Sequence, residues 1–170
     1  METLEQLEER TWWGYLGQDL QELLTSSEFI FSDVESWGAE LVSGKNRLHD
    51  YSFVLFPAAK AYEGFLKKLF LSLGFISEED YYGKHFRIGK ALNPSLPKEL
   101  ARENVYGKLV QFCQSHTLAD KLWETWRLCR NLTFHWFPNE KNAITLVEAG
   151  ERIEMIIDSI DEAFVECKIK

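Results

Sequence analysis

The sequence has little cysteine, proline and glycine. Its 170 residues include three Cys, four Pro and ten Gly. The cysteines Cys113, Cys129 and Cys167 are odd in number and widely spaced, so they predict no disulfide framework and favour a reducing compartment. We therefore expect a cytoplasmic protein. The scarcity of proline and glycine leaves room for long helices, because these two residues are the weakest helix formers.

Long apolar runs are also missing. The longest apolar stretch is interrupted by Glu63, Lys67 and Lys68, which excludes a membrane span there. The chain starts with an acidic segment rather than a basic one followed by apolar residues, so it predicts no secretory signal. A single Cys-x-x-His pair, Cys113 and His116, has no matching second pair, and we expect no metal and no other cofactor.

The familiar catalytic motifs are absent as well. The segment from Gly83 to Gly89-Lys90 differs from a phosphate-binding loop, because five residues instead of four separate its glycines. Ala91 also stands where such a loop carries Ser or Thr. The sequence contains no Gly-x-Ser-x-Gly, His-Glu-x-x-His or dinucleotide-binding pattern. Nucleotide hydrolysis by a phosphate-loop mechanism is therefore not predicted.

Positive charge is scarce overall but concentrated in the middle of the chain. The formal net charge is −8. Residues 1–40 carry ten negative charges and one positive, whereas residues 41–130 carry fourteen positive charges and nine negative. Residues 131–170 are acidic again, with eight negative charges and four positive. A locally basic groove with acidic surroundings is compatible with a polyanionic ligand but does not require one.

Apolar and aromatic residues are abundant and predict one helical domain. They make up 45% and 14% of the chain, which suffices for a sizeable core in a domain of this length. Apolar residues recur at three- and four-residue steps, which is typical of amphipathic helices. We expect an all-α bundle of four to five helices over residues 1–170, with the helices at 3–26, 47–73, 98–114, 118–134 and 142–166.

The remaining segments and breaks are predicted from their turn residues. Residues 27–46 are expected to be irregular, so residues 1–46 form an N-terminal helix and irregular segment beside a core bundle at 47–166. Residues 81–97 are expected to form a loop with one short helix. Pro57 predicts a kink or break, Gly74 a helix stop, and Ser77 with Asp80 a new helix start.

The chemically most informative run is Arg130-Asn131-Leu132-Thr133-Phe134-His135. Arginine binds phosphate through its planar guanidinium, and histidine exchanges protons near neutral pH. Together they suffice to cleave RNA without a metal, because RNA carries its own nucleophile, the ribose 2′-hydroxyl. On a regular helix, however, Arg130 and His135 point about 140° apart. They converge only if the helix ends between them or if a second subunit completes the site.

The same spacing also arises by chance in many proteins. His135 could simply stabilise the C-terminal end of a helix, where a positive charge is favourable. On spacing alone, a purely structural helical bundle therefore explains the run at least as well as a catalytic site.

The run resembles the signature of the HEPN superfamily, in which an Arg is followed by a polar residue and, after four to six residues, by a His. Arg130, Asn131 and His135 match this signature. The stretch from Asp50 to Phe70 is similar to the long helix of HEPN toxins related to ribonuclease LS, in which an acidic residue joins the Arg and His; Glu63 occupies the corresponding position. The resemblance covers about residues 47–165.

The resemblance implies a metal-independent endoribonuclease that acts as a toxin of a toxin–antitoxin or phage-defence system. It implies a homodimer with the two Arg/His pairs facing one another, and an antitoxin that covers the site. Arg130 would hold the phosphate, His135 would act as general base or acid, Asn131 would orient them, and Glu63 would join them. The products expected from 2′-hydroxyl attack are a 2′,3′-cyclic phosphate and a 5′-hydroxyl.

Two features depart from these relatives. HEPN toxins that are silenced by nucleotidylation carry a Tyr two residues after the His, where this chain has Phe137. The ribonuclease LS toxins also carry additional N-terminal domains that this sequence lacks.

Three further basic residues are candidates for RNA binding, namely Lys60, Lys67 and Arg127. Glu63 lies three and four residues from Lys60 and Lys67 and could equally form surface ion pairs with them. The pair Trp123 and Trp126 is more typical of a core than of a base-stacking surface. The alternative function is a non-catalytic HEPN-like module that binds a protein partner or RNA.

Overall fold

All regular structure in the described part of the chain is helical, which confirms the predicted all-α class and the helical bundle. The described residues form nine α-helices and one π-helix instead of the four to five helices predicted, because the predicted segments divide and short helices form between them. The computed structural model describes residues 4–37, 48–97, 104–138 and 142–168. The elements are α1 (Leu4–Glu8), α2 (Trp13–Leu16), α3 (Gln18–Ser36), α5 (Ser52–Ser72), α6 (Glu78–Tyr82), α7 (Ile88–Ala91), α8 (Val105–Cys113), α9 (Thr117–Trp126), the π-helix η2 (Arg127–Leu132) and α10 (Leu146–Glu166).

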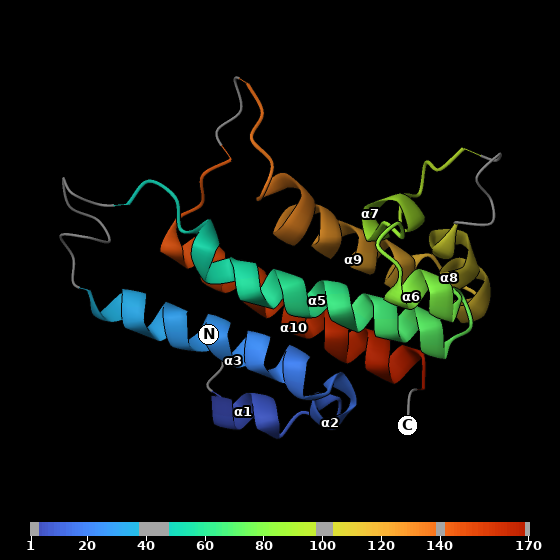
Figure 1. The fold of residues 1–170 in the computed structure, drawn as a ribbon, viewed down its shortest axis with the longest axis horizontal. Coiled ribbons are helices and arrows are strands. Elements are labelled where there is room, and N and C mark those ends of the chain that lie inside the picture. Colours follow the sequence, from blue (N-terminus) through green and yellow to red (C-terminus); the bar gives the residue numbers. More distant parts are fainter. Residues whose placement is uncertain (1–3, 38–47, 98–103, 139–141, 169–170) are drawn as a thin grey trace.

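Helix α5 is the centre of the bundle. It packs against α3 on one side and α10 on another, and α9 with η2 lies along α10 and α5 (Figure 1). Ten of its residues are buried, and they include Phe65 and Leu66. The short helices α6, α7 and α8 gather at one end of α5, whereas α1 and α2 lie beneath α3 (Figure 1). None of the described helices is both long and apolar enough to cross a membrane.

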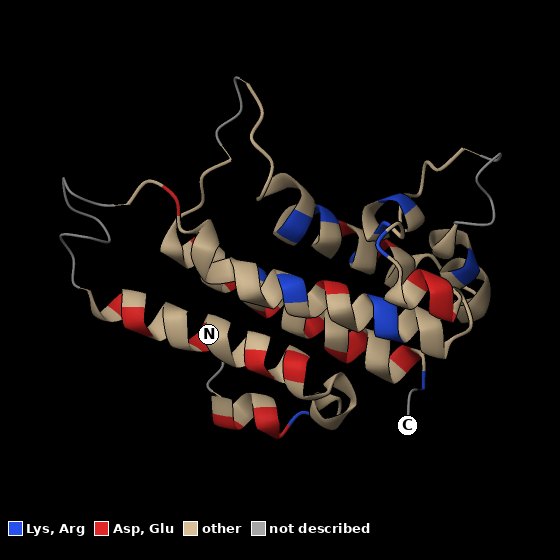
Figure 2. Ribbon diagram, in the orientation of Figure 1, with Lys and Arg blue, Asp and Glu red and all other residues tan. Residues whose placement is uncertain are grey.

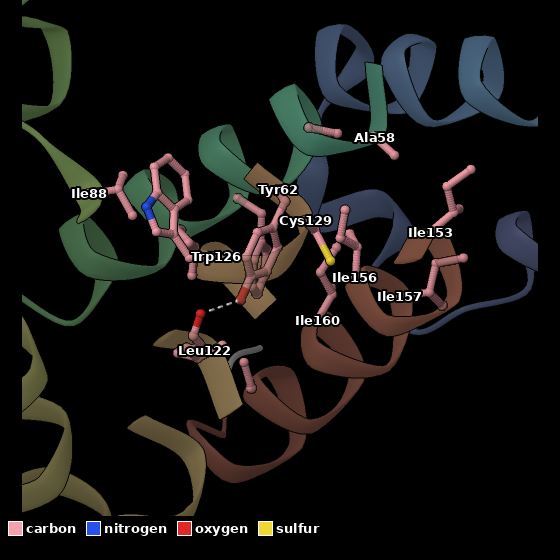
Figure 3. Packing of buried hydrophobic residues seen from close by; sticks show 14 of the residues in the cluster. Ala58, Tyr62, Ile88, Leu122, Trp126, Cys129, Ile153, Ile156, Ile157 and Ile160 are labelled. Carbon is pink, nitrogen blue, oxygen red and sulfur yellow. Dashed lines mark hydrogen bonds between the residues drawn. The ribbon is translucent and has the colours of Figure 1, made fainter. Parts of the chain in front are cut away.

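A buried hydrogen-bond network joins three helices inside the apolar core. The Tyr62 hydroxyl on α5 lies 3.2 Å from the Leu122 carbonyl oxygen on α9 and 2.9 Å from Ser159 Oγ on α10. Burial raises the pKa of Tyr62, so the phenol stays neutral. Tyr62 is surrounded by Trp126, Cys129 and Ile160, and Ile88 of α7 faces Trp126 (Figure 3). This contact brings α7 close to the end of α9.

The N-terminal segment differs from the predicted single helix over 3–26. Residues 9–12 separate α1 from α2, and Gly17, at a left-handed φ of 84°, separates α2 from α3. The cause is tertiary: Trp12 is fully buried and its indole donates a 2.5 Å hydrogen bond to Asp161 on α10. Arg10 donates to the same carboxylate. Anchoring these two side chains on α10 outweighs the local helical pattern.

The segment predicted to be irregular is largely helical. Helix α3 continues to Ser36, so the expectation for residues 27–46 was wrong over 27–36. Phe29, Ile30 and Phe31 lie within α3, and Val34 is buried against the core. The remaining part, 38–46, falls outside the described residues. Tertiary packing of one face of α3 on α5 therefore extends a helix that its Ser and Asp residues disfavour.

Helix α5 begins at Ser52 rather than at residue 47 and ends at Ser72. Pro57 does not break it. Proline removes one hydrogen-bond donor, and near the start of a long, buried helix this single loss is tolerated. The predicted stop at Gly74 is confirmed: Gly74 has φ 68°, its N–H bonds the Leu71 carbonyl and the next N–H bonds the Phe70 carbonyl. This is a Schellman motif.

Two other helix starts differ from the prediction, and in both a side chain caps the helix at the observed start. Helix α8 begins at Val105, after Asn104 caps it, and residues 98–103 of the predicted helix lie outside the described part. Helix α10 begins at Leu146 instead of 142, because Thr145 and Glu148 form a capping box. The predicted start at Ser77 with Asp80 and the short helix within 81–97, here α7, are confirmed. The helix predicted at 118–134 is α9 with η2, and it stops at Leu132.

Candidate functional site

Glu63, Arg130, Asn131 and His135 line one pocket of about 430 Å³. Glu63 comes from α5, Arg130 and Asn131 come from η2, and His135 follows η2. All four predicted catalytic residues therefore meet in a single chain. The volume lies within the range usual for small-ligand sites.

The end of η2 explains how Arg130 and His135 reach the same pocket. Helix η2 ends at Leu132, between these two residues, and the Thr133 and Phe134 N–H groups turn back to the Arg130 carbonyl. His135 follows in a segment without regular structure. The separation of about 140° that a regular helix would impose therefore does not apply to this pair. A second subunit is not needed for the convergence.

Side chains from α10 hold the end of η2. The Arg152 guanidinium donates to the Leu128 carbonyl oxygen at 3.2 Å and to Thr133 Oγ1 at 2.5 Å. Thr133 Oγ1 in turn donates to the Leu128 carbonyl at 2.6 Å. The buried Cys129 thiol contacts the Arg152 carbonyl at 3.5 Å. Arg152 of α10 thus supplies a hydrogen bond to the Leu128 carbonyl, a main-chain group of η2.

Arg130 is positioned by rings and by one carboxylate. Its guanidinium carbon lies 5.9 Å from the Trp126 ring centre and 5.5 Å from that of Phe134. Arg130 Nε lies 3.6 Å from Glu63 Oε2, which is an ion pair but too long for a hydrogen bond. Within the described part of the chain this buried Nε has no hydrogen-bond partner. The arginine is therefore fixed in place while its hydrogen-bonding capacity is not exhausted.

His135 is held in one tautomer. Its Nδ1 lies 2.6 Å from the Asn131 carbonyl oxygen, and a carbonyl only accepts hydrogen bonds. Nδ1 is consequently the donor in this contact, and in the neutral ring the lone pair lies on Nε2. The imidazole also stacks on Phe137, with ring centres 6.1 Å apart. Asn131 thus orients His135 through its main chain.

The three predicted RNA-binding residues do not line the pocket. Arg127 makes a hydrogen-bonded ion pair with Glu124, at 2.8 and 2.5 Å. The hydrogen bond from Arg127 lowers the pKa of Glu124, so the carboxylate stays charged. Lys60 is exposed with its Nζ 5.8 Å from the Phe56 ring centre, and Lys67 is half-buried on α5.

The structure adds two basic residues that the sequence argument missed. Arg87 and Lys90, at the start of and within α7, form the opposite wall of the pocket. Gly89 lets this wall approach closely, because a Cβ there would lie 2.7 Å from Trp126 Nε1. The available signal was the Arg87-to-Lys90 run itself, which fails as a phosphate loop but still places two cations beside a glycine. Trp126 also has a double role, since it is buried in the core and lines the pocket.

The pocket is basic in an acidic protein. Three cations and one carboxylate line it, in addition to His135. Figure 2 shows basic residues on α5, α7, α8 and η2, among other segments, whereas the charged residues of α1 and α3 are all acidic. A concave site with an excess of positive charge attracts anions more strongly than the net charge suggests.

In the described ranges, no three His, Cys, Asp or Glu side chains are grouped as metal ligands would be. No family model, no curated protein and no solved structure matches the chain. The functional assignment therefore depends on the geometry of the pocket and on the resemblance of its residues.

Proposed function

We propose that the protein is a metal-independent endoribonuclease of the HEPN type, which cleaves RNA through attack of the 2′-hydroxyl. The observation that carries the proposal is the meeting of Arg130, His135 and Glu63 in one basic pocket. These are the residues that match the HEPN signature. Glu63 lies far in sequence from the other two, and Arg130 and His135 would point about 140° apart on a regular helix.

His135 is the proton-transfer group of this proposal. Its Nε2 accepts the proton of the 2′-hydroxyl while the 2′ oxygen forms a bond to phosphorus. The bond from phosphorus to the 5′ oxygen breaks, and that oxygen leaves with a proton from the imidazolium or from water. The Asn131 carbonyl stabilises the imidazolium, because it accepts a hydrogen bond from Nδ1–H.

Arg130 stabilises the charge that develops on the phosphate oxygens. Trp126 and Phe134 hold its guanidinium in place before the substrate arrives, so little reorganisation is needed during the reaction. Glu63 aligns the guanidinium from the α5 side. Arg87 and Lys90 supply positive charge on the opposite wall, where neighbouring phosphates of the strand bind.

The biological setting in this proposal is that of a toxin with an antitoxin partner, which follows from the resemblance. The homodimer is part of the same proposal. Since each chain already assembles its own Arg130 and His135, the dimer would serve to place two pockets along one strand and not to complete either of them.

Cleavage of a single-stranded oligoribonucleotide in EDTA tests the proposal. We expect the wild type to release fragments ending in a 2′,3′-cyclic phosphate, and His135→Ala to lose at least about a hundredfold in rate, since general-base effects are about 10²–10⁴-fold. A deoxyribose at the scissile position should abolish cleavage there, because it removes the nucleophile.

His49→Ala is the matched control, because His49 is exposed and does not line the pocket. It should cleave like the wild type. Equal rates for His135→Ala and wild type would exclude the proposed catalytic role. RNA binding without any cleavage by the wild type would instead favour the non-catalytic module.

A further inference from the structure

Aromatic rings and cations form a continuous row that leads out of the pocket. The row runs from Trp126 through Arg130, Phe134 and Phe56 to Lys60. The guanidinium of Arg130 lies between the Trp126 and Phe134 rings, at 5.9 and 5.5 Å. Phe134 meets Phe56 edge-on with ring centres 5.4 Å apart. Lys60 Nζ lies 5.8 Å from the Phe56 ring centre. We call these five residues the aromatic–cation row.

The row passes from buried to exposed. Trp126 is 8% exposed, whereas Phe56 is 45% exposed and Lys60 is also on the surface. Phe56 and Lys60 lie on the first half of α5, one turn apart, so they occupy the same face of that helix. Phe56 thus presents part of its ring to solvent beside the Lys60 ammonium.

We infer that the aromatic–cation row is a stacking track for single-stranded RNA, on which bases next to the cleaved one rest as the strand leaves the pocket. The inference rests on the proposed function, because it extends the same site. Rings accept bases of any kind on their faces, and neighbouring cations neutralise the backbone phosphates; proteins that bind single strands combine these two elements. In this row Trp126, Phe134 and Phe56 supply the rings, and Arg130 and Lys60 supply the positive charge.

The charge of the row favours RNA over a second copy of the chain. Interface cores are depleted in lysine, and two copies of this surface facing one another would oppose like charges from Lys60 and Arg130. A polyanion instead complements both cations. The row is also continuous with the pocket through Arg130, which a strand bound at the pocket must pass.

Binding measured without cleavage tests the track. Full-length His135→Ala, a variant chosen to prevent cleavage, is titrated into a fluorescein-labelled single-stranded oligoribonucleotide, and anisotropy is recorded. Adding Phe56→Leu to His135→Ala removes the ring but keeps an apolar side chain, and we expect binding about five- to tenfold weaker, at the lower end of the loss for one base–ring stack. Phe56→Tyr keeps the ring and should bind like the parent.

Phe29→Leu is the matched control. Phe29 is 68% exposed on α3, which contributes no residue to the pocket. This variant should bind RNA as its parent does, and thermal unfolding of all variants should confirm an intact fold. Lys60→Gln provides a second variant and should weaken binding and reduce its salt dependence.

Three outcomes would overturn the inference. The first is unchanged RNA binding in Phe56→Leu, and the second is an equal loss in Phe29→Leu. The third is a change of oligomeric state in Phe56→Leu by light scattering, which would make the row an interface between copies. Failure of the proposed function has a different signature, because there the wild type does not cut RNA even if the variants show that Phe56 contributes to binding it.

Discussion

At the scale of single residues, Arg130 shows how the pocket prepares a cation for a ligand. Two rings and a carboxylate surround its guanidinium, yet its Nε has no hydrogen-bond partner among the described residues. The side chains of Arg130 and Glu63 are 28% and 34% exposed, so water screens their attraction. Partly exposed ion pairs of this kind contribute about 0–1 kcal/mol to stability. The pair therefore matters for orientation more than for folding.

Glu63→Gln tests this separation of roles. We expect the free energy of unfolding to change by less than about 1 kcal/mol. The cleavage rate should fall about tenfold, because losing one charge-assisted contact at the guanidinium corresponds to about 1.5 kcal/mol of barrier. Urea unfolding and single-turnover cleavage measure the two effects.

Glu22→Gln, at an exposed position of α3, is the control and should leave cleavage unchanged. A large loss of stability in Glu63→Gln with normal cleavage would show that Glu63 is structural.

At the scale of elements, the wide turn of η2 decides the geometry of the site. A π turn leaves main-chain carbonyls without their usual partners, and Arg152 and Thr133 satisfy the Leu128 carbonyl. Arg152 belongs to α10, the last helix in the chain. The turn is therefore held by a residue 24 positions from Leu128 in the sequence, and its shape is a tertiary property.

Arg152→Ala should both destabilise the protein and slow cleavage. It removes the donor to the Leu128 carbonyl and to Thr133, and we expect a loss of about 1–3 kcal/mol of unfolding free energy. Relaxation of η2 towards a regular helix would move His135 away from Arg130 and lower the cleavage rate. Urea unfolding, with cleavage assayed under folded conditions, measures both.

Glu151→Ala, at the neighbouring exposed position of α10, should change neither quantity appreciably. Normal cleavage in a folded Arg152→Ala protein would mean that η2 keeps its shape without α10.

At the scale of the whole molecule, charge is divided between faces. Helix α3 carries only acidic charged residues, and four of the six described helices that contribute no residue to the pocket include acidic residues, namely α1, α3, α6 and α10; the pocket itself gathers Arg87, Lys90 and Arg130. This division reconciles a net charge of −8 with a polyanionic ligand. Under the proposed function, the acidic faces would repel RNA and direct a strand to the basic pocket.

The salt dependence of RNA binding tests whether the cations of the pocket contact phosphates. In the His135→Ala background, Arg87→Gln combined with Lys90→Gln should flatten the plot of log affinity against log salt concentration. Each lost phosphate contact changes that slope by about 0.7 for a single strand, so we expect a change of about 1.4. Anisotropy titrations between low and moderate salt measure it.

The double variant Arg10→Gln/Lys121→Gln removes two cations that pair with carboxylates of α10, and it should leave the slope unchanged. An equal flattening in both double variants would indicate that RNA responds only to net charge.

Local patterns were sufficient for much of the architecture. The periodic apolar residues of α5 and α10, the Gly74 stop and the Ser77 cap depend on neighbours within a few positions, and they were predicted from them. Where the prediction failed, a distant partner was responsible. Trp12 and Arg10 break the first helix because Asp161 lies across the bundle, and no pattern within residues 3–26 contains that information.

The candidate site likewise combines features that the sequence predicts with features that only folding produces. The sequence by itself determined which residues are candidates for the proposed chemistry, because an arginine, a histidine and an acid have fixed donors, acceptors and charges wherever they stand. Only the tertiary structure decided that Arg130 and His135 line one pocket within one chain, that Glu63 joins them and that Arg87 and Lys90 line it as well. The physical reason is that the pocket depends on where η2 ends, next to the Arg152 hydrogen bonds, and on the close approach of Gly89 to Trp126. Both are contacts between segments that the chain brings together only when it folds.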